Sequence, residues 1–109
     1  MSEFYKLVVF VPSESLVGLK SALFKAGAGR LGNYEQCAWA VLGQGQFRPM
    51  AGADPAEGRV GEVCALDEYR LEVLVAGSDM SAVVDALKTS HPYEHPAFEI
   101  MPVLTDWPE

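Results

Sequence analysis

The chain has 109 residues, half of them hydrophobic, and a formal net charge of −7 at neutral pH. This size and composition predict one folded domain, residues 1–109, and exclude an intrinsically disordered chain. The acidic balance argues against binding to nucleic acid, and no apolar run reaches the roughly 18 residues that a membrane span needs. The first twelve residues, MSEFYKLVVFVP, lack the basic start and the cleavage site of a signal peptide. We therefore expect a cytoplasmic protein.

The first part of the chain predicts a strand, a helix and a second strand. Residues 4–11, FYKLVVFV, form a short apolar run that is typical of a buried central strand. A helix is expected next, with Ser13 as its N-cap and Gly27 at its C-terminal end. Residues 34–42, YEQCAWAVL, predict the second strand. The residues expected on one face of that strand are Cys37, Trp39 and Val41.

Residues 43–65, GQGQFRPMAGADPAEGRVGEVCA, are rich in glycine and proline. We expect short β segments around Gln46–Arg48 and an irregular segment over residues 52–61. The P-loop pattern of a phosphate site is missing, so tight turns and bulges explain the glycines best. The rival interpretation is an effector loop like that of PII proteins, in which Arg48 and Arg59 contact an anion.

The second part of the chain repeats the order of strand, helix and strand. Residues 67–76, DEYRLEVLVA, alternate between apolar side chains on one face and Glu68, Arg70 and Glu72 on the other. Ser78 or Asp79 is the expected cap of a helix whose apolar side carries Met80, Val83, Val84 and Leu87. Residues 97–104, AFEIMPVL, predict the last strand.

This order predicts an α+β, ferredoxin-like βαββαβ sandwich: a four-stranded antiparallel sheet with both helices on one face. The Gly/Pro-rich extension would lie between the second and third strands. The other sheet face, half apolar and half charged, is expected to be an oligomer contact or a ligand surface. The side chains expected in the core, besides those of the helices, are Leu7, Val9, Leu71, Val73 and Ile100.

Three stretches together resemble a known family: residues 32–63, the strand DEYRLEVLV, and HPYEHPAFEIMPV near the end. They are similar to the YqfO-type insert domain found in many Nif-three-like dinuclear-metal proteins and also as a stand-alone protein. HPYEHPAFEIMPV also resembles, more distantly, the C-terminal stretch of CutA proteins, trimeric ferredoxin-like domains allied in fold to PII proteins. The residues that carry the pattern are Gly43, Gly45, Phe47, Pro49, Gly52, Pro55, Gly58, Gly61, Glu68, Glu72 and His91-Pro92-Tyr93-Glu94.

The resemblance implies a ferredoxin-like fold and a homo-oligomer, with a trimer favoured. In the larger family the two metals are held by domains that flank the insert, and residues 1–109 do not include those domains. The metal-dependent activity proposed for the family therefore does not carry over to this chain.

Both histidines of the chain lie in SHPYEHPAF, residues 90–98. His91 and His95 are four residues apart, as helical metal ligands would be, but Pro92 and Pro96 forbid a helix there. We expect a structural corner, in which Tyr93 packs as an anchor and Glu94 accepts backbone N–H groups. The functional alternative is a site completed by another subunit, where His91, Tyr93 and Glu94 meet Glu68 or Glu72 across an interface.

The remaining metal candidates are weaker. Cys37 and Cys64 have no CxxC spacing, so we expect reduced thiols, although either could join a histidine in a soft-metal site. The acidic residues Glu62, Asp67, Glu68 and Glu72 would need a trimer to converge on a cation. Catalytic signatures such as GxSxG and HExxH are missing.

We therefore expect a non-catalytic oligomerising or ligand-sensing module. No cofactor is expected, while a divalent metal or a small molecule remains open as a ligand. The alternative is a CutA-like metal-binding protein with its site at a subunit interface. The two hypotheses differ in whether the purified protein retains a metal ion.

Overall fold

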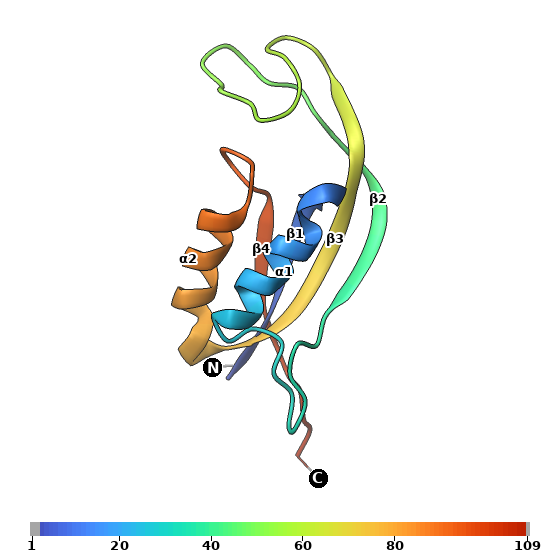
Figure 1. Ribbon diagram of the computed structural model, residues 1–109. Coiled ribbons are helices and arrows are strands. Elements are labelled where there is room, and N and C mark those ends of the chain that lie inside the picture. Colours follow the sequence, from blue (N-terminus) through green and yellow to red (C-terminus); the bar gives the residue numbers. More distant parts are fainter. Residues whose placement is uncertain (1–2, 109) are drawn as a thin grey trace.

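The computed structural model describes residues 3–108 of the chain (Figure 1). Its strands are β1 (Phe4–Pro12), β2 (Trp39–Phe47), β3 (Cys64–Ala76) and β4 (Phe98–Val103). Its helices are α1 (Leu16–Lys25) and α2 (Met80–Ser90), each preceded by one turn of 3₁₀ helix, Ser13–Ser15 and Gly77–Asp79. In the described residues no helix has the length and apolar character needed to cross a bilayer.

The four strands form one antiparallel sheet in the order β2-β3-β1-β4, and both helices cover the same face (Figure 1). The predicted α+β ferredoxin-like arrangement is confirmed. It follows from the alternation in β1 and β3, because Leu7 pairs with Val73, and Val9 with Leu71, on the face that the helices cover.

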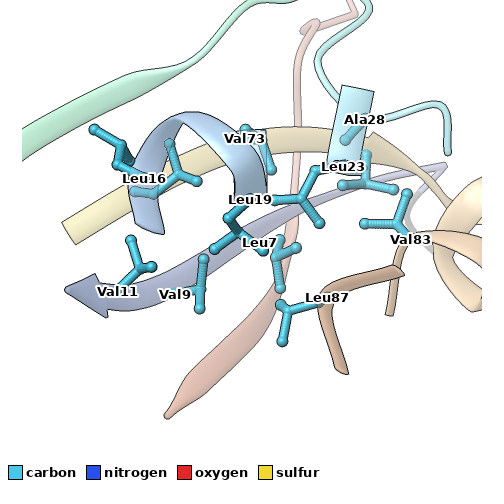
Figure 2. Close-up of a cluster of buried hydrophobic side chains, with 12 residues drawn as sticks. Leu7, Val9, Val11, Leu16, Leu19, Leu23, Ala28, Val73, Val83 and Leu87 are labelled. Atoms are coloured by element: carbon cyan, nitrogen blue, oxygen red, sulfur yellow. The ribbon is translucent and has the colours of Figure 1, made fainter. Parts of the chain in front are cut away.

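The core lies between this sheet face and the two helices (Figure 2). Leu7, Val9, Leu71 and Val73 are buried as predicted, together with the apolar sides of the helices. Ile100 was expected there and is not, because 38% of it is exposed. It pairs with Leu7 but lies on β4, an edge strand that has a neighbour on one side only.

The predicted position of the second strand was wrong. Residues 34–38 lie outside the sheet, where Gln36 has a φ of 58° and the Cys37 amide donates to Gly29 O. The strand instead begins at Trp39 and continues through Gly43 and Gly45 to Phe47. Trp39 and Val41 share a face as predicted, whereas Cys37 does not belong to the strand. Gln46 and Phe47 end this strand, and residues 52–61 are irregular as expected.

The β2–β3 hairpin extends beyond the rest of the sheet. The last residue of β1, Pro12, pairs with Glu68, so the first four residues of β3 pair only with β2. In Figure 1 this part of the hairpin rises above the helices, and the connection between β2 and β3 bends back over them. We refer to the hairpin residues 42–47 and 64–68 as the hairpin extension.

Candidate functional site

Two irregular segments approach the hairpin extension and enclose a cavity of about 590 Å³. One is residues 49–57, between β2 and β3, and the other is residues 93–97, between α2 and β4. Pockets of this size hold small organic ligands in other proteins. The side chains that give the cavity its chemistry are aromatic (Phe10, Phe47 and Tyr93) and charged (Glu57, Glu68, Arg70 and Glu94).

His91 fixes the turn that leads from α2 into the cavity wall. It is 6% exposed, its Nε2 lies 2.7 Å from Phe10 O, and the Tyr93 amide donates to its Nδ1 over 3.1 Å. Since the amide can only donate, Nδ1 accepts, and Nε2 must carry the proton that reaches the carbonyl. Burial lowers the pKa of His91, which keeps this neutral form. Both ring nitrogens are therefore engaged within the chain.

Tyr93 connects the turn after α2 to the hairpin extension. Its hydroxyl donates to Glu68 Oε2 over 2.7 Å, and its ring lies 5.9 Å from that of Phe47 between centroids. Burial and the Glu68 carboxylate raise the pKa of Tyr93, so the hydroxyl stays protonated. The expected meeting of Tyr93 with Glu68 thus occurs inside one chain and needs no second subunit.

The Glu68 carboxylate occupies the space that a side chain at Gly45 would need. A Cβ at position 45 would overlap Glu68 Oε1, whereas a Cβ at Gly43, two residues earlier in β2, would meet nothing within 4 Å. A strand glycine often marks such a close approach. Gly45 therefore allows the carboxylate to lie across β2 while its other oxygen holds Tyr93.

A single polar contact joins the two segments that wall the cavity. The Asp54 amide donates to Glu94 Oε1 over 3.2 Å, at an exposed position. Residues 49–61 also close on themselves, because the Gly61 amide donates to Pro49 O over 2.8 Å and Arg48 Nε donates to Gly61 O over 3.1 Å. Residues 49–57 are thus held at their base and bridged only lightly to residues 93–97.

The two arginines of the predicted anion loop do not line the cavity. Arg48 is used in closing residues 49–61, as described above. Arg59 Nε lies 3.9 Å from Glu62 Oε2, in a pair whose side chains are mostly exposed.

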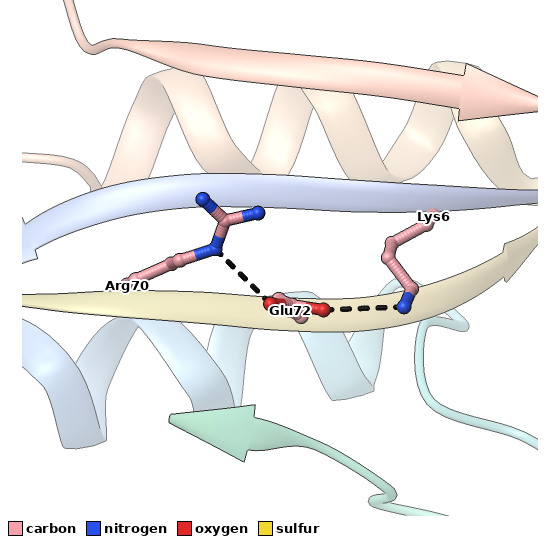
Figure 3. Close-up of polar contacts among 3 residues, drawn as sticks. All are labelled: Lys6, Arg70 and Glu72. Atoms are coloured by element: carbon pink, nitrogen blue, oxygen red, sulfur yellow. Dashed lines mark hydrogen bonds and ion pairs between the residues drawn. The ribbon is translucent and has the colours of Figure 1, made fainter. Parts of the chain in front are cut away.

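Glu72 lies further along β3 and does not line the cavity, but it pairs with Arg70, which does (Figure 3). It pairs with Lys6 Nζ over 3.2 Å and with Arg70 Nε over 3.0 Å. These two hydrogen-bonded cations lower the pKa of Glu72. The cluster lies on the sheet face opposite the helices, since Glu72 alternates with Leu71 and Val73.

The candidate metal ligands do not come together within residues 3–108, where no three His, Cys, Asp or Glu side chains form a group that could hold an ion. His95 is exposed at the cavity wall, Cys37 lies in the loop before β2, and Cys64 begins β3. Both cysteines carry free thiols.

Sequence reasoning missed Phe10 and Glu57 as cavity residues and read Gly45 and Phe47 only as parts of a family pattern. One signal was available for Gly45. Glycines at positions 43 and 45 alternate with Leu42, Gln44 and Gln46 as strand residues do, and in the sheet Gly43 pairs with Glu68 and Gly45 with Leu66.

The chain is similar to one part of several longer proteins. No family model matches it. It is 43% identical over 95 residues to a Mycobacterium leprae protein named GTP cyclohydrolase 1 type 2 homolog, covering 87% of this chain and 25% of that protein. The chain therefore spans about a quarter of this relative, whose name describes the whole protein.

Solved structures agree with the sequence relatives. A Bacillus cereus protein related to NIF3 superposes with a TM-score of 0.80 and 35% identity, over 94% of this chain and 26% of that one. CutA1 from Shewanella sp. SIB1 superposes with a TM-score of 0.69 over 97% of this chain and 86% of that one. At 17% identity, the CutA1 match shows a shared fold. The chain is thus similar to one domain of these longer NIF3-related proteins, which confirms the resemblance that its glycine pattern and HPYE motif indicate, and it shares the fold of CutA1.

Proposed function

We propose that this domain is a non-catalytic module that senses a small molecule in the cavity at the hairpin extension. The observation that carries the proposal is the cavity of about 590 Å³, walled by residues 49–57 and 93–97. The only hydrogen bond between these two segments in the described residues is the exposed one from Asp54 to Glu94. A ligand that touches both segments would favour their closed arrangement, because binding shifts a population toward the state it prefers.

The polar groups of the HPYE corner support a non-catalytic role. The Tyr93 hydroxyl stays protonated and donates a hydrogen bond to Glu68, and a protonated hydroxyl is a weak nucleophile. His91 has both nitrogens engaged by backbone groups and cannot accept a further proton without losing the Tyr93 amide. Neither ring offers a free base to a substrate in the cavity.

Fragment screening by NMR tests the sensing proposal. We expect a saturable ligand to shift the amides of Phe47 and Tyr93 and to slow hydrogen exchange in residues 49–61. Ala56→Trp, which fills the cavity from its wall, should abolish both effects. The matched control is Val17→Trp on the exposed side of α1, where 76% of the residue is exposed. The proposal fails if no fragment shifts these amides, or if the shifts persist in Ala56→Trp.

A second role, self-association, is favoured by the free sheet face. Trp39 is 66% exposed and Val41 48%, and they share the face of Glu72 and Arg70, with which they pair across β2 and β3. Exposed apolar side chains on an unpaired edge strand favour association with another copy. The assembly we propose is the homotrimer expected from the resemblance to CutA proteins.

Analytical ultracentrifugation tests the assembly. Trp39→Glu should reduce the sedimenting mass, since it places a charge in the proposed contact. The control is Trp107→Glu, which changes a tryptophan outside the sheet that is 74% exposed. A monomeric wild type, or an assembly that tolerates Trp39→Glu, would contradict it. Native mass spectrometry of the same sample decides the CutA-like alternative, which requires a stoichiometric divalent ion.

A further inference from the structure

The charges around the cavity are unbalanced. Among its lining residues Glu57, Glu68 and Glu94 are acidic, whereas Arg70 is the one arginine or lysine and His95 the one histidine. Glu57 and Glu68 are half-buried, so their fields are screened less by water than those of fully exposed carboxylates. A concave surface of one charge sign concentrates ligands of the opposite sign.

Arg70 offsets only part of the three acidic charges, because it is one cation and is directed toward Glu72, a carboxylate that it shares with Lys6. Its Nε donates to Glu72 Oε2 over 3.0 Å, and its guanidinium carbon lies 5.8 Å from the centre of the Phe10 ring. In contrast, Glu57, Glu68 and Glu94 form no ion pair within residues 3–108. Glu68 is held by the neutral Tyr93 hydroxyl and Glu94 by a backbone amide.

The walls of the cavity also suit a cation with an apolar body. Phe47 and Tyr93 both line the cavity, with their rings at 60° to each other and 5.9 Å apart between centroids, and the Tyr93 hydroxyl donates to the Glu68 carboxylate. Aromatic faces attract ammonium groups and also cover flat apolar surface. Glu68 itself is held in place by Tyr93 and by the close approach to Gly45.

We propose that the cavity binds a small organic cation, a flat apolar body that carries an ammonium group, with Glu68 as the carboxylate that pairs with it. This inference rests on the proposed sensing function and adds the chemical class of the ligand. It also separates the cavity from the anion loop expected at Arg48 and Arg59, which lie outside it.

Three indole compounds of nearly equal shape test the charge preference: tryptamine, neutral tryptophol and indole-3-propionate. In NMR titrations of the full chain, tryptamine should bind at least about tenfold more tightly than indole-3-propionate, with tryptophol between them. Its affinity should fall as salt is raised, since partly exposed charges are screened. Equal binding of the three would overturn the charge preference, and binding by none would overturn the ligand class; either result leaves the sensing proposal to the fragment screen.

Variants then locate the carboxylate. Glu68→Gln still accepts the Tyr93 hydroxyl, so it should fold, lower the affinity for tryptamine about tenfold and leave that for tryptophol unchanged. Glu62→Gln makes the same change outside the cavity and should have no effect. Gly45→Ala should weaken tryptamine binding by displacing Glu68, while Gly43→Ala should not. Unchanged affinity for tryptamine in Glu68→Gln would overturn the assignment of Glu68. The proposal would also be overturned if the chemical shifts of the lining residues changed on dilution of the free protein, because a second copy of the chain would then fill the cavity.

Discussion

The part of the sheet under the helices and the hairpin extension are held together by different interactions. Under the helices, Leu7, Leu71 and Leu87 have no exposed surface, and each is stabilised by many apolar neighbours. The hairpin extension has no helix on it and is joined to residues 93–97 by the bond from Tyr93 to Glu68, while the bond from Asp54 to Glu94 joins the two segments that wall the cavity. Burial of apolar area dominates stability, so we expect the first region to set the free energy of unfolding and the second to open at a lower free energy.

The largest effect is expected from breaking the core. Leu71→Ala should lower the free energy of unfolding by about 2–5 kcal/mol, because it removes a fully buried side chain in the middle of β3. Ile100→Ala, on the same sheet face but 38% exposed, should cost clearly less. Urea denaturation measures both. A loss below about 0.5 kcal/mol for Leu71→Ala would contradict the register of β1 and β3.

In the hairpin extension, Tyr93→Phe should cost about 1–2 kcal/mol. It removes the hydroxyl that donates to a charged carboxylate and keeps the ring packing with Phe47. Tyr34→Phe, at a residue 75% exposed, is the control and should be neutral. If Tyr93→Phe is also neutral in thermal denaturation, the Tyr93–Glu68 bond does not hold the cavity wall.

The same contrast separates what the sequence could predict from what it could not. β1, β3 and both helices carry a repeating apolar pattern, because each buries one side on the core, and that pattern located them. β2 is an edge strand with little buried surface, so its apolar alternation is weak. Its two glycines indicated the start of an irregular segment, and the strand was therefore predicted about five residues too close to the N-terminus.

The cavity had no such local signal. Its walls come from residues 49–57 and 93–97, and the contact between them joins Asp54 to Glu94 across 40 positions. The stretch HPYEHP did predict a corner after the second helix, since its two prolines, Pro92 and Pro96, end a helix for local reasons. That Tyr93 would reach Glu68 of its own chain depends on the length of the hairpin extension, which local patterns do not encode.

The pH dependence of stability should reveal His91, where the two regions meet. Its pKa is lowered in the folded state by burial, while the unfolded chain titrates near pH 6.5. The unfolded state therefore binds more protons as the pH falls below about 6.5, and stability falls with it until the folded-state pKa is reached. The slope should be at most about 1.4 kcal/mol per pH unit. Denaturation at several pH values should show this slope vanish in His91→Gln and persist in His95→Gln, and a slope retained in His91→Gln would contradict it.

The smallest effect is expected at Glu72, on the sheet face opposite the helices. Its partners Lys6 and Arg70 are each 44% exposed in their side chains, and exposed ion pairs contribute about 0–1 kcal/mol. Glu72→Gln should therefore cost no more than about 1 kcal/mol, and less in high salt. The control, Glu62→Gln, removes a longer and more exposed pair and should cost nothing measurable. A loss well above about 1 kcal/mol that depends on protein concentration would mean that Glu72 supports an interface between subunits, because a monomer's surface ion pair does not respond to dilution.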